Sequence, residues 1–268
     1  MMKKIHIVLS LSLLVFALVS IMAQQQPTQK KKLLAIGMSA GYQHESVSDA
    51  LGTLYELGQE TGLWDTLMHT DVRPITKKRL PDNAKNLDYF DAVFFMTSGE
   101  LPMDDQQKAD LLSFVKEDGK GFLGAHNATD TFYKWPEYGE MIGGYFDGHP
   151  WNQFDATIKV EDPDFPAMKP FPPTFHLMDE IYQTKDFSRS RVRVLMSLDT
   201  SNVDLKEQGV HTTDLPIAWA RNYGKGRVFY CGLGHRQEVW QRKDIRQMWT
   251  EAVKWAMGLT DGDATPRP

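Results

Sequence analysis

The sequence has one cysteine, no block of basic residues and no strong excess of either charge. A single thiol, Cys231, excludes a disulfide framework and a cysteine zinc site within one chain, so any metal must use histidine and carboxylate ligands. Thirty Lys and Arg against 35 Asp and Glu give a formal net charge of −5. A nucleic-acid or anionic-lipid surface is therefore not expected. The expected partner is a small, uncharged molecule.

The amino terminus has the pattern of a targeting segment. Lys3 and Lys4 precede an apolar stretch from Ile7 to Met22, and Ala23 is followed by a polar run. The stretch is shorter than the roughly 20 residues that span a bilayer, which favours a cleavable signal peptide over residues 1–23, with an uncleaved anchor as the alternative. No cysteine follows it that could carry a lipid. We expect a periplasmic or secreted protein without a stable membrane anchor after cleavage.

The first half of the mature chain alternates apolar runs with helical patterns. Continuous apolar runs predict strands of a parallel sheet covered on both faces. Ser46 is the expected cap of one helix, and Asp104 with Gln107 forms a capping-box pattern at the start of another. This order predicts right-handed crossovers and a doubly wound α/β sheet. The strands are expected over 33–38, 66–69, 92–97 and 121–125.

The pattern changes after His126. Residues 127–150 are rich in Gly, Pro and aromatic residues, which is typical of a long functional loop with one short helix. A closing helix is expected around 245–256, because its apolar residues fall on one face. We expect a single domain over 31–258 and a frayed tail over 259–268. Further strands that extend the sheet are expected over 154–160, 175–183, 192–198, 217–220 and 228–232.

Three histidines, His44, His126 and His235, follow three separate apolar strands. Ligands of doubly wound sheets bind at the carboxyl ends of the strands, so these residues are expected to converge at one edge. His149 is a fourth candidate. The remaining histidines of the mature chain lack such a placement and are assigned structural or surface roles, namely His69, His176 and His211.

The residue types at this edge leave two chemistries open. Gly124-Ala125-His126 lies where a nucleophile elbow would lie, yet it offers no serine or cysteine, so a Ser-His-Asp mechanism lacks its nucleophile. The histidines can act as general acid and base, or as ligands of zinc or a similar divalent cation. No His-x-x-x-His pair decides between these roles. Gly37 and Gly41 lack the spacing of a phosphate-binding turn, so we expect no nucleotide.

Carboxylates and aromatic residues complete the candidate site. Asp130 lies near His126 in sequence, and Glu180 follows Asp179. Glu180 is interpreted as an acid–base group or as a partner that orients a histidine. Aromatic rings of the long loop could stack on a sugar, although packing within the loop is the alternative. The candidate substrate-binding residues are Tyr42, Trp135, His149, Trp151 and Arg236.

Five motifs follow one another along the chain: GYQHES at 41–46, GFLGAHNATD at 121–130, GGYFDGHPW at 143–151, DEIY at 179–182 and GKGRVFY at 224–230 through GHR at 234–236. Taken together, they resemble those of the ThuA-like trehalose-utilisation proteins. The resemblance extends from about Lys31 to Gly258 and implies a flavodoxin-like, class I glutamine amidotransferase-like three-layer sandwich, with a mostly parallel central sheet and additional strands. Amidotransferases carry cysteine at the elbow, where this chain has His126, so glutaminase activity is not expected.

The resemblance also implies a role in the catabolism of sugars, associated with disaccharides that carry a 3-keto group. A keto group at carbon 3 acidifies the proton at carbon 2, so a base and an electrophile could expel the glycosidic oxygen by elimination, followed by addition of water. The leading hypothesis is an exported enzyme that cleaves 3-keto-glycosides, with His44, His126 and His235 as metal ligands or acid–base groups. The alternatives are a two-carboxylate glycoside hydrolase using Asp130 and Glu180, and a sugar-binding protein without turnover.

Overall fold

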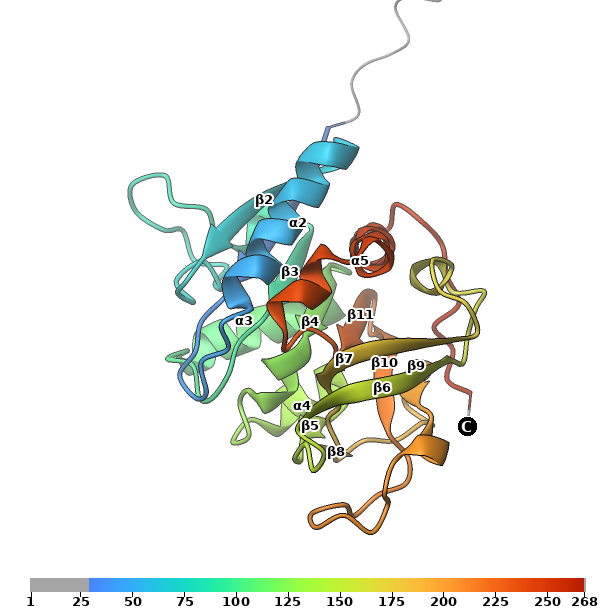
Figure 1. The fold of residues 1–268 in the computed structure, drawn as a ribbon. Coiled ribbons are helices and arrows are strands. Elements are labelled where there is room, and N and C mark those ends of the chain that lie inside the picture. Colours follow the sequence, from blue (N-terminus) through green and yellow to red (C-terminus); the bar gives the residue numbers. More distant parts are fainter. Residues whose placement is uncertain (1–28, 268) are drawn as a thin grey trace, which may run out of the picture. The chain divides into compact units, whose positions relative to one another are not determined.

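A nine-stranded sheet runs through the part of the chain that the computed structural model describes, residues 29–267 (Figure 1). From residue 31 onward the chain divides no further into compact units. The expected signal peptide over residues 1–23 lies outside the described residues. The strands, in chain order, are β1 Lys31–Ile36, β2 Trp64–His69, β3 Ala92–Phe95, β4 Gly121–Ala125, β6 Gln153–Val160, β7 Thr174–Glu180, β9 Arg193–Leu198, β10 Pro216–Tyr223 and β11 Gly226–Cys231.

One half of the sheet is parallel. The strands lie in the order β2-β1-β3-β4-β11-β10-β9-β6-β7, and the first five are parallel to one another. All residues of β3 and β4 are buried, as expected for strands covered on both faces. The order 2-1-3-4 is that of flavodoxin-like sheets, in which the carboxyl ends of the strands form the ligand-binding edge.

The other half of the sheet is antiparallel. β10 pairs with β11 and β9, and β6 joins β9 to the edge strand β7. Buried and exposed residues alternate along β7, because the outer face of this strand is solvated. A separate two-stranded sheet joins β5 (Tyr145–Phe146) to β8 (Thr184–Lys185). The additional strands expected from the sequence thus extend the parallel sheet through β11.

Helices cover both faces of the sheet. α2 (Val47–Thr61) and α5 (Lys243–Ala256) pack on one face with Leu33 and Ala35 of β1. α3 (Asp105–Lys116) and α4 (Pro136–Ile142) pack on the other, with Leu34 and Ile36. The alternation along β1 divides the core into two layers, and the predicted three-layer sandwich is confirmed.

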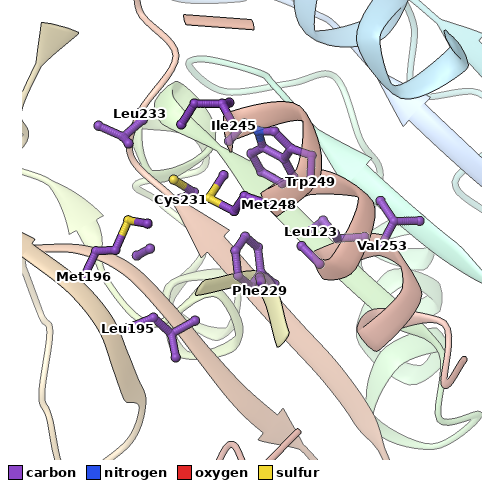
Figure 2. Close-up of a cluster of buried hydrophobic side chains, with 14 of the residues drawn as sticks. Leu123, Leu195, Met196, Phe229, Cys231, Leu233, Ile245, Met248, Trp249 and Val253 are labelled. Carbon is purple, nitrogen blue, oxygen red and sulfur yellow. The ribbon is translucent and has the colours of Figure 1, made fainter. Parts of the chain in front are cut away.

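The core under α5 contains the lone thiol. Figure 2 shows Cys231 and Phe229 of β11 among Met248 and Trp249 of α5, with Leu195 and other residues nearby. Cys231 is a buried free cysteine, and burial raises the pKa of its thiol to about 12. The thiol is therefore a core residue and stays protonated at neutral pH.

The two predicted helix starts have different outcomes. The Asp104 side chain accepts a hydrogen bond from the Gln107 backbone N–H, and the Gln107 side-chain oxygen accepts one from the Asp104 backbone N–H, so the capping box is confirmed. Ser46 is the N-cap residue of α2, as predicted, but its expected side-chain cap is absent. The Ser46 side chain makes no cap bond, and its Oγ donates instead to the Gly234 carbonyl at 2.7 Å. A buried acceptor from a distant segment outcompetes the local helix amide.

The carboxyl-terminal tail differs from the frayed segment that we expected. Ala264 is buried, Trp255 Nε1 donates to the Gly262 carbonyl, and Arg193 donates to the Thr265 carbonyl. These contacts hold the tail against β9 and α5 as far as Thr265. Within residues 29–267, no helix combines the length and the apolar character needed to cross a membrane.

Candidate metal centre

Four side chains that can bind a metal meet at the carboxyl edge of the sheet. His44, His126, Glu180 and His235 each offer one ligand atom, and these atoms lie within 4.8 Å of one another. His44, His126 and His235 follow the parallel strands β1, β4 and β11, whose carboxyl ends share this edge. Glu180 is the last residue of β7. The convergence predicted for the three histidines is confirmed, and a carboxylate joins them.

His126 occupies a strained turn directly after β4. Its φ is +41°, in the left-handed region that non-glycine residues seldom adopt. The ring is fully buried, and Nδ1 lies 2.7 Å from the Gly232 carbonyl oxygen. A carbonyl can only accept, so Nδ1 carries the proton and Nε2 presents a lone pair. The elbow position thus holds a nitrogen ligand whose tautomer is set by the backbone.

His235 is held by contacts to the residues on either side of it. The two carboxylate oxygens of buried Asp179 accept separately, from the Gly234 N–H at 2.7 Å and from the Arg236 N–H at 3.2 Å. Gly234 has φ +124°, and a Cβ there would lie 2.8 Å from the Trp240 ring. Burial raises the pKa of Asp179 to about 7, against the effect of the amide donors. Asp179 is therefore a positioning residue for His235.

Glu180 lies between two of the histidines. Its Oε2 is 2.9 Å from His235 Nδ1 and 3.8 Å from His126 Nε2. His235 Nδ1 is buried and, despite this closeness, is not aligned for a hydrogen bond to any described residue. Although burial opposes both shifts, the contact raises the pKa of His235 and lowers that of Glu180. The two atoms lie as close together as ligands of one cation would, without being hydrogen-bonded to each other.

His44 and His126 are neutral at pH 7. Burial lowers the pKa of His44 to about 4 and that of His126 well below its ordinary value. His44 Nδ1 lies 3.1 Å from the side-chain amide of buried Asn127. Neutral imidazole is the form that binds a metal, so burial prepares both rings for that role.

Tyr182 is the site residue that the sequence analysis did not single out. Its buried hydroxyl lies 2.6 Å from His126 Nε2 and 3.4 Å from His44 Nε2. Burial raises the pKa of Tyr182 well above its usual value, so the hydroxyl is protonated and donates to the lone pair of His126. One signal was available in the sequence: residues two apart on an extended chain share a face, and Tyr182 follows Glu180 by two.

The donor set fits a divalent cation. Ligands about 2.0–2.2 Å from zinc at tetrahedral corners lie about 3.4 Å apart. The distances from Glu180 Oε2 to His235 Nδ1 and His126 Nε2, 2.9 and 3.8 Å, bracket that value. Imidazole and carboxylate together suit zinc and other first-row metals. The His126–Gly232 bond is the kind of outer support that orients a metal-binding histidine.

A cavity of about 390 Å³ and another of about 330 Å³ open beside the cluster. The smaller one brings together three more of the predicted residues, Tyr42, Asp130 and His149. Tyr133 donates to Asp130 at 2.8 Å, and burial raises the pKa of Asp130. His149 stacks on Phe146 and Tyr182, and its Nδ1 is buried without a hydrogen-bond partner among the described residues. The smaller cavity is lined by Tyr42, His44, Asp130, Phe146, His149, Glu180, Tyr182 and His235.

The remaining predicted substrate-binding residues, Trp135, Trp151 and Arg236, do not line the smaller cavity. Trp135 is buried against Phe132 and Tyr138, and Trp151 is half-buried with its Nε1 donating to the Asp204 carbonyl. Neither tryptophan lines the two cavities. Arg236 lines the larger one. Among the described residues, the histidines outside the metal cluster are His69, His149, His176 and His211.

Comparison with known families supports the fold and a role in carbohydrate utilisation. The family model ThuA, described as trehalose utilisation, matches residues 32–256. No curated protein matches the chain. This match covers the β1, β4, β7 and β11 segments that carry the four candidate ligands.

Several solved structures share the architecture. A ThuA-like protein from Bacteroides uniformis aligns with a TM-score of 0.69 and 20% identity, over 87% of this chain and 94% of that one. A ThuA-like protein from Parabacteroides merdae gives 0.67 and 17%, over 89% and 98%. A β-galactosidase from Bacillus circulans sp. alkalophilus gives 0.50 and 11%, over 85% of this chain and 31% of that one. At these identities the likeness shows the fold alone.

Proposed function

Because the chain belongs to the ThuA family of trehalose-utilisation proteins, we propose that it is an exported enzyme that cleaves 3-keto-glycosides at the cavity beside its histidine cluster. The observation that carries the proposal is the convergence of His44, His126, Glu180 and His235 within 4.8 Å, next to a cavity of sugar-binding size. Imidazole nitrogens and a carboxylate at such an edge are suited to holding a cation that polarises a carbonyl oxygen.

The proposed reaction is an elimination followed by hydration. A base removes the acidified proton at carbon 2, the electron pair forms the double bond between carbons 1 and 2, and the bond from carbon 1 to the glycosidic oxygen breaks. The leaving oxygen takes a proton from an acid. Water then adds at carbon 1 as a proton returns to carbon 2, so the net change is hydrolysis.

Two residues outside the metal cluster supply the acid–base chemistry. Asp130 is the carboxylate of the smaller cavity besides Glu180, and its raised pKa makes it a stronger base than an ordinary aspartate. We propose that Asp130 is the base that removes the proton at carbon 2. His149 is the imidazole of that cavity besides His44 and His235. We propose that it is the acid that donates a proton to the leaving oxygen. A bound divalent cation would supply positive charge for the oxygen at carbon 3.

Ordinary two-carboxylate hydrolysis is a second candidate, because Asp130 and Glu180 line the same cavity. It requires no 3-keto group. The contact of Glu180 with His235 at 2.9 Å favours a role in the cluster over a role as nucleophile. The choice of substrate therefore separates the two mechanisms.

Product analysis tests the proposal directly. Purified protein is incubated with native disaccharides and with their 3-keto forms, with and without a chelator. We expect cleavage of the 3-keto forms only, and its loss in His126→Ala and after chelation. His176→Ala is the matched control, because this histidine is exposed on β7. Cleavage of native disaccharides would favour the two-carboxylate mechanism, and binding without cleavage would favour a sugar-binding protein.

Export is a separate proposal with its own test. Mass spectrometry of the amino terminus of the protein recovered from the periplasm or medium should find a chain that begins at Gln24. A chain that still begins at Met1 and stays in the cytoplasm contradicts it.

A further inference from the structure

The larger of the two cavities has no role in the reaction described above. Its volume is about 390 Å³, close to the 330 Å³ of the smaller one. The two share Tyr42, His44 and His235, so two of the four cluster residues lie in the wall common to both, while Glu180 lines the smaller cavity alone. The larger cavity is lined by Tyr42, Gln43, His44, Glu45, Gln153, His235, Arg236, Gln237 and Glu238.

The two cavities differ in chemistry. The smaller one has Phe146 and Tyr182 in its wall, which suit the apolar face of a ring. Beyond the shared residues, the larger one is lined by amide, carboxylate and guanidinium groups alone. Such groups donate to and accept from hydroxyls. The larger cavity is therefore suited to a molecule rich in hydroxyl groups.

The charges of the larger cavity favour an uncharged ligand. The Arg236 guanidinium donates to Gln153 Oε1 at 3.0 Å and to Glu238 Oε1 at 3.2 Å, so its charge is offset by a carboxylate. Glu45 adds a second carboxylate, which has no hydrogen-bond partner among residues 29–267. Outside the wall shared with the smaller cavity, two carboxylates face one guanidinium, so a phosphate or uronate bound there would meet more negative than positive charge, whereas a neutral sugar would not.

We propose that the larger cavity binds the second, uncharged sugar unit of a disaccharide whose linkage crosses the wall formed by Tyr42, His44 and His235. The inference rests on the proposed function and narrows its substrate class to unphosphorylated disaccharides. Each cavity is near the lower limit of about 300 Å³ for small-molecule sites, so each suits one ring, while the pair suits two. Tyr42 lines both cavities and is 66% exposed, so its side chain is free to contact both sugar rings.

Gln153 is the residue that tests the second cavity most cleanly. It is the first residue of β6, is exposed, and lines only the larger cavity of the two. Its Oε1 is engaged by Arg236, which leaves its amide N–H groups to donate to a sugar hydroxyl. Its replacement by alanine removes a hydrogen-bond donor without opening the core.

Calorimetric titration of the full mature chain measures the contribution of the second cavity. The probes are native trehalose, maltose and cellobiose, each compared with the methyl glucoside of the same anomer. At least one disaccharide should bind tenfold or more tightly than its methyl glucoside, and Gln153→Ala should reduce that ratio about tenfold. Gln208→Ala is the matched control, an exposed glutamine outside both cavities. Trehalose 6-phosphate should bind no better than trehalose.

The outcomes separate this inference from the proposed function. The inference is overturned if no disaccharide binds more tightly than its methyl glucoside, if Gln153→Ala weakens both kinds of ligand equally, or if the phosphorylated sugar binds best. Failure of the proposed function has a different signature: the disaccharide advantage and its loss in Gln153→Ala are both present, yet neither 3-keto-disaccharides nor methyl 3-keto-glucosides are cleaved.

Discussion

Replacing Asp179 by asparagine should have two effects: it should displace His235 and lower the free energy of unfolding. The two oxygens of Asp179 accept from two different amides, those of Gly234 and Arg236. An asparagine has one oxygen, so either the buried Gly234 N–H or the partly buried Arg236 N–H must face an NH₂ group. A buried donor without an acceptor costs about 1–3 kcal/mol.

The size of the effect follows from the length of the chain. For a domain of 150–250 residues, 1 kcal/mol lowers the melting temperature by about 2–4 °C, so Asp179→Asn should lower it by roughly 2–12 °C. Loss of a residue that orients a metal ligand typically weakens metal affinity by about 10–100-fold. Differential scanning calorimetry and titration with zinc measure the two effects.

The exposed residue Asp164 offers a matched control, since Asp164→Asn changes the same atoms away from the site. It should leave both measurements unchanged. If Asp179→Asn melts within about 1 °C of the wild type and binds zinc equally well, the two amide contacts do not position His235, and the account of this loop is wrong.

Three further predictions address the cluster and the core. Zinc at one hundred times its dissociation constant should stabilise the chain by about 2.7 kcal/mol, so chelation should lower the melting temperature by roughly 5–10 °C; an unchanged melting temperature and no metal by mass spectrometry would exclude the site. Tyr182→Phe removes a hydrogen bond to His126 that a bound cation would replace, so the metal-free protein should melt lower while zinc binds more tightly; weaker zinc binding would show that the hydroxyl supports the cation. Asp110 accepts from Thr76, Gln106 and the Lys77 backbone, which hold its pKa below the usual value against the effect of burial. Its stabilisation is therefore complete above the unfolded pKa of about 3.9 and disappears as the pH falls through the folded value, so the deficit of Asp110→Asn in urea unfolding should shrink with acidification; a constant deficit would refute this.

Much of the layered fold could be predicted from local patterns. Strands covered on both faces have continuous apolar runs, and those at β1, β3 and β4 were located on that signal. The capping box of Asp104 and Gln107 is a contact between residues three apart, so the sequence contains both partners. Ser46 shows the limit of such reasoning, because its hydroxyl bonds to Gly234, 188 residues away.

Part of the candidate site could likewise be predicted from the sequence, and part could not. The convergence of His44, His126 and His235 was predictable, because parallel strands bring the residues that follow them to one edge whatever those residues are. The roles of the aromatic residues were not. Trp135 and Trp151 were expected near a sugar, yet neither lines the two cavities, since the path of the 127–151 loop depends on contacts with distant segments.

The order of apolar runs, turns and histidines along the chain was enough to determine the class of fold and the edge at which three imidazoles meet, because periodicity and strand direction are local properties. Only the tertiary structure decided that Glu180 closes the cluster, that Tyr182 reaches His126, and that two cavities share one wall. Glu180 arrives on β7, four strands away from β11 in the sheet, and its position depends on the pairing of β9, β6 and β7, which no local pattern specifies.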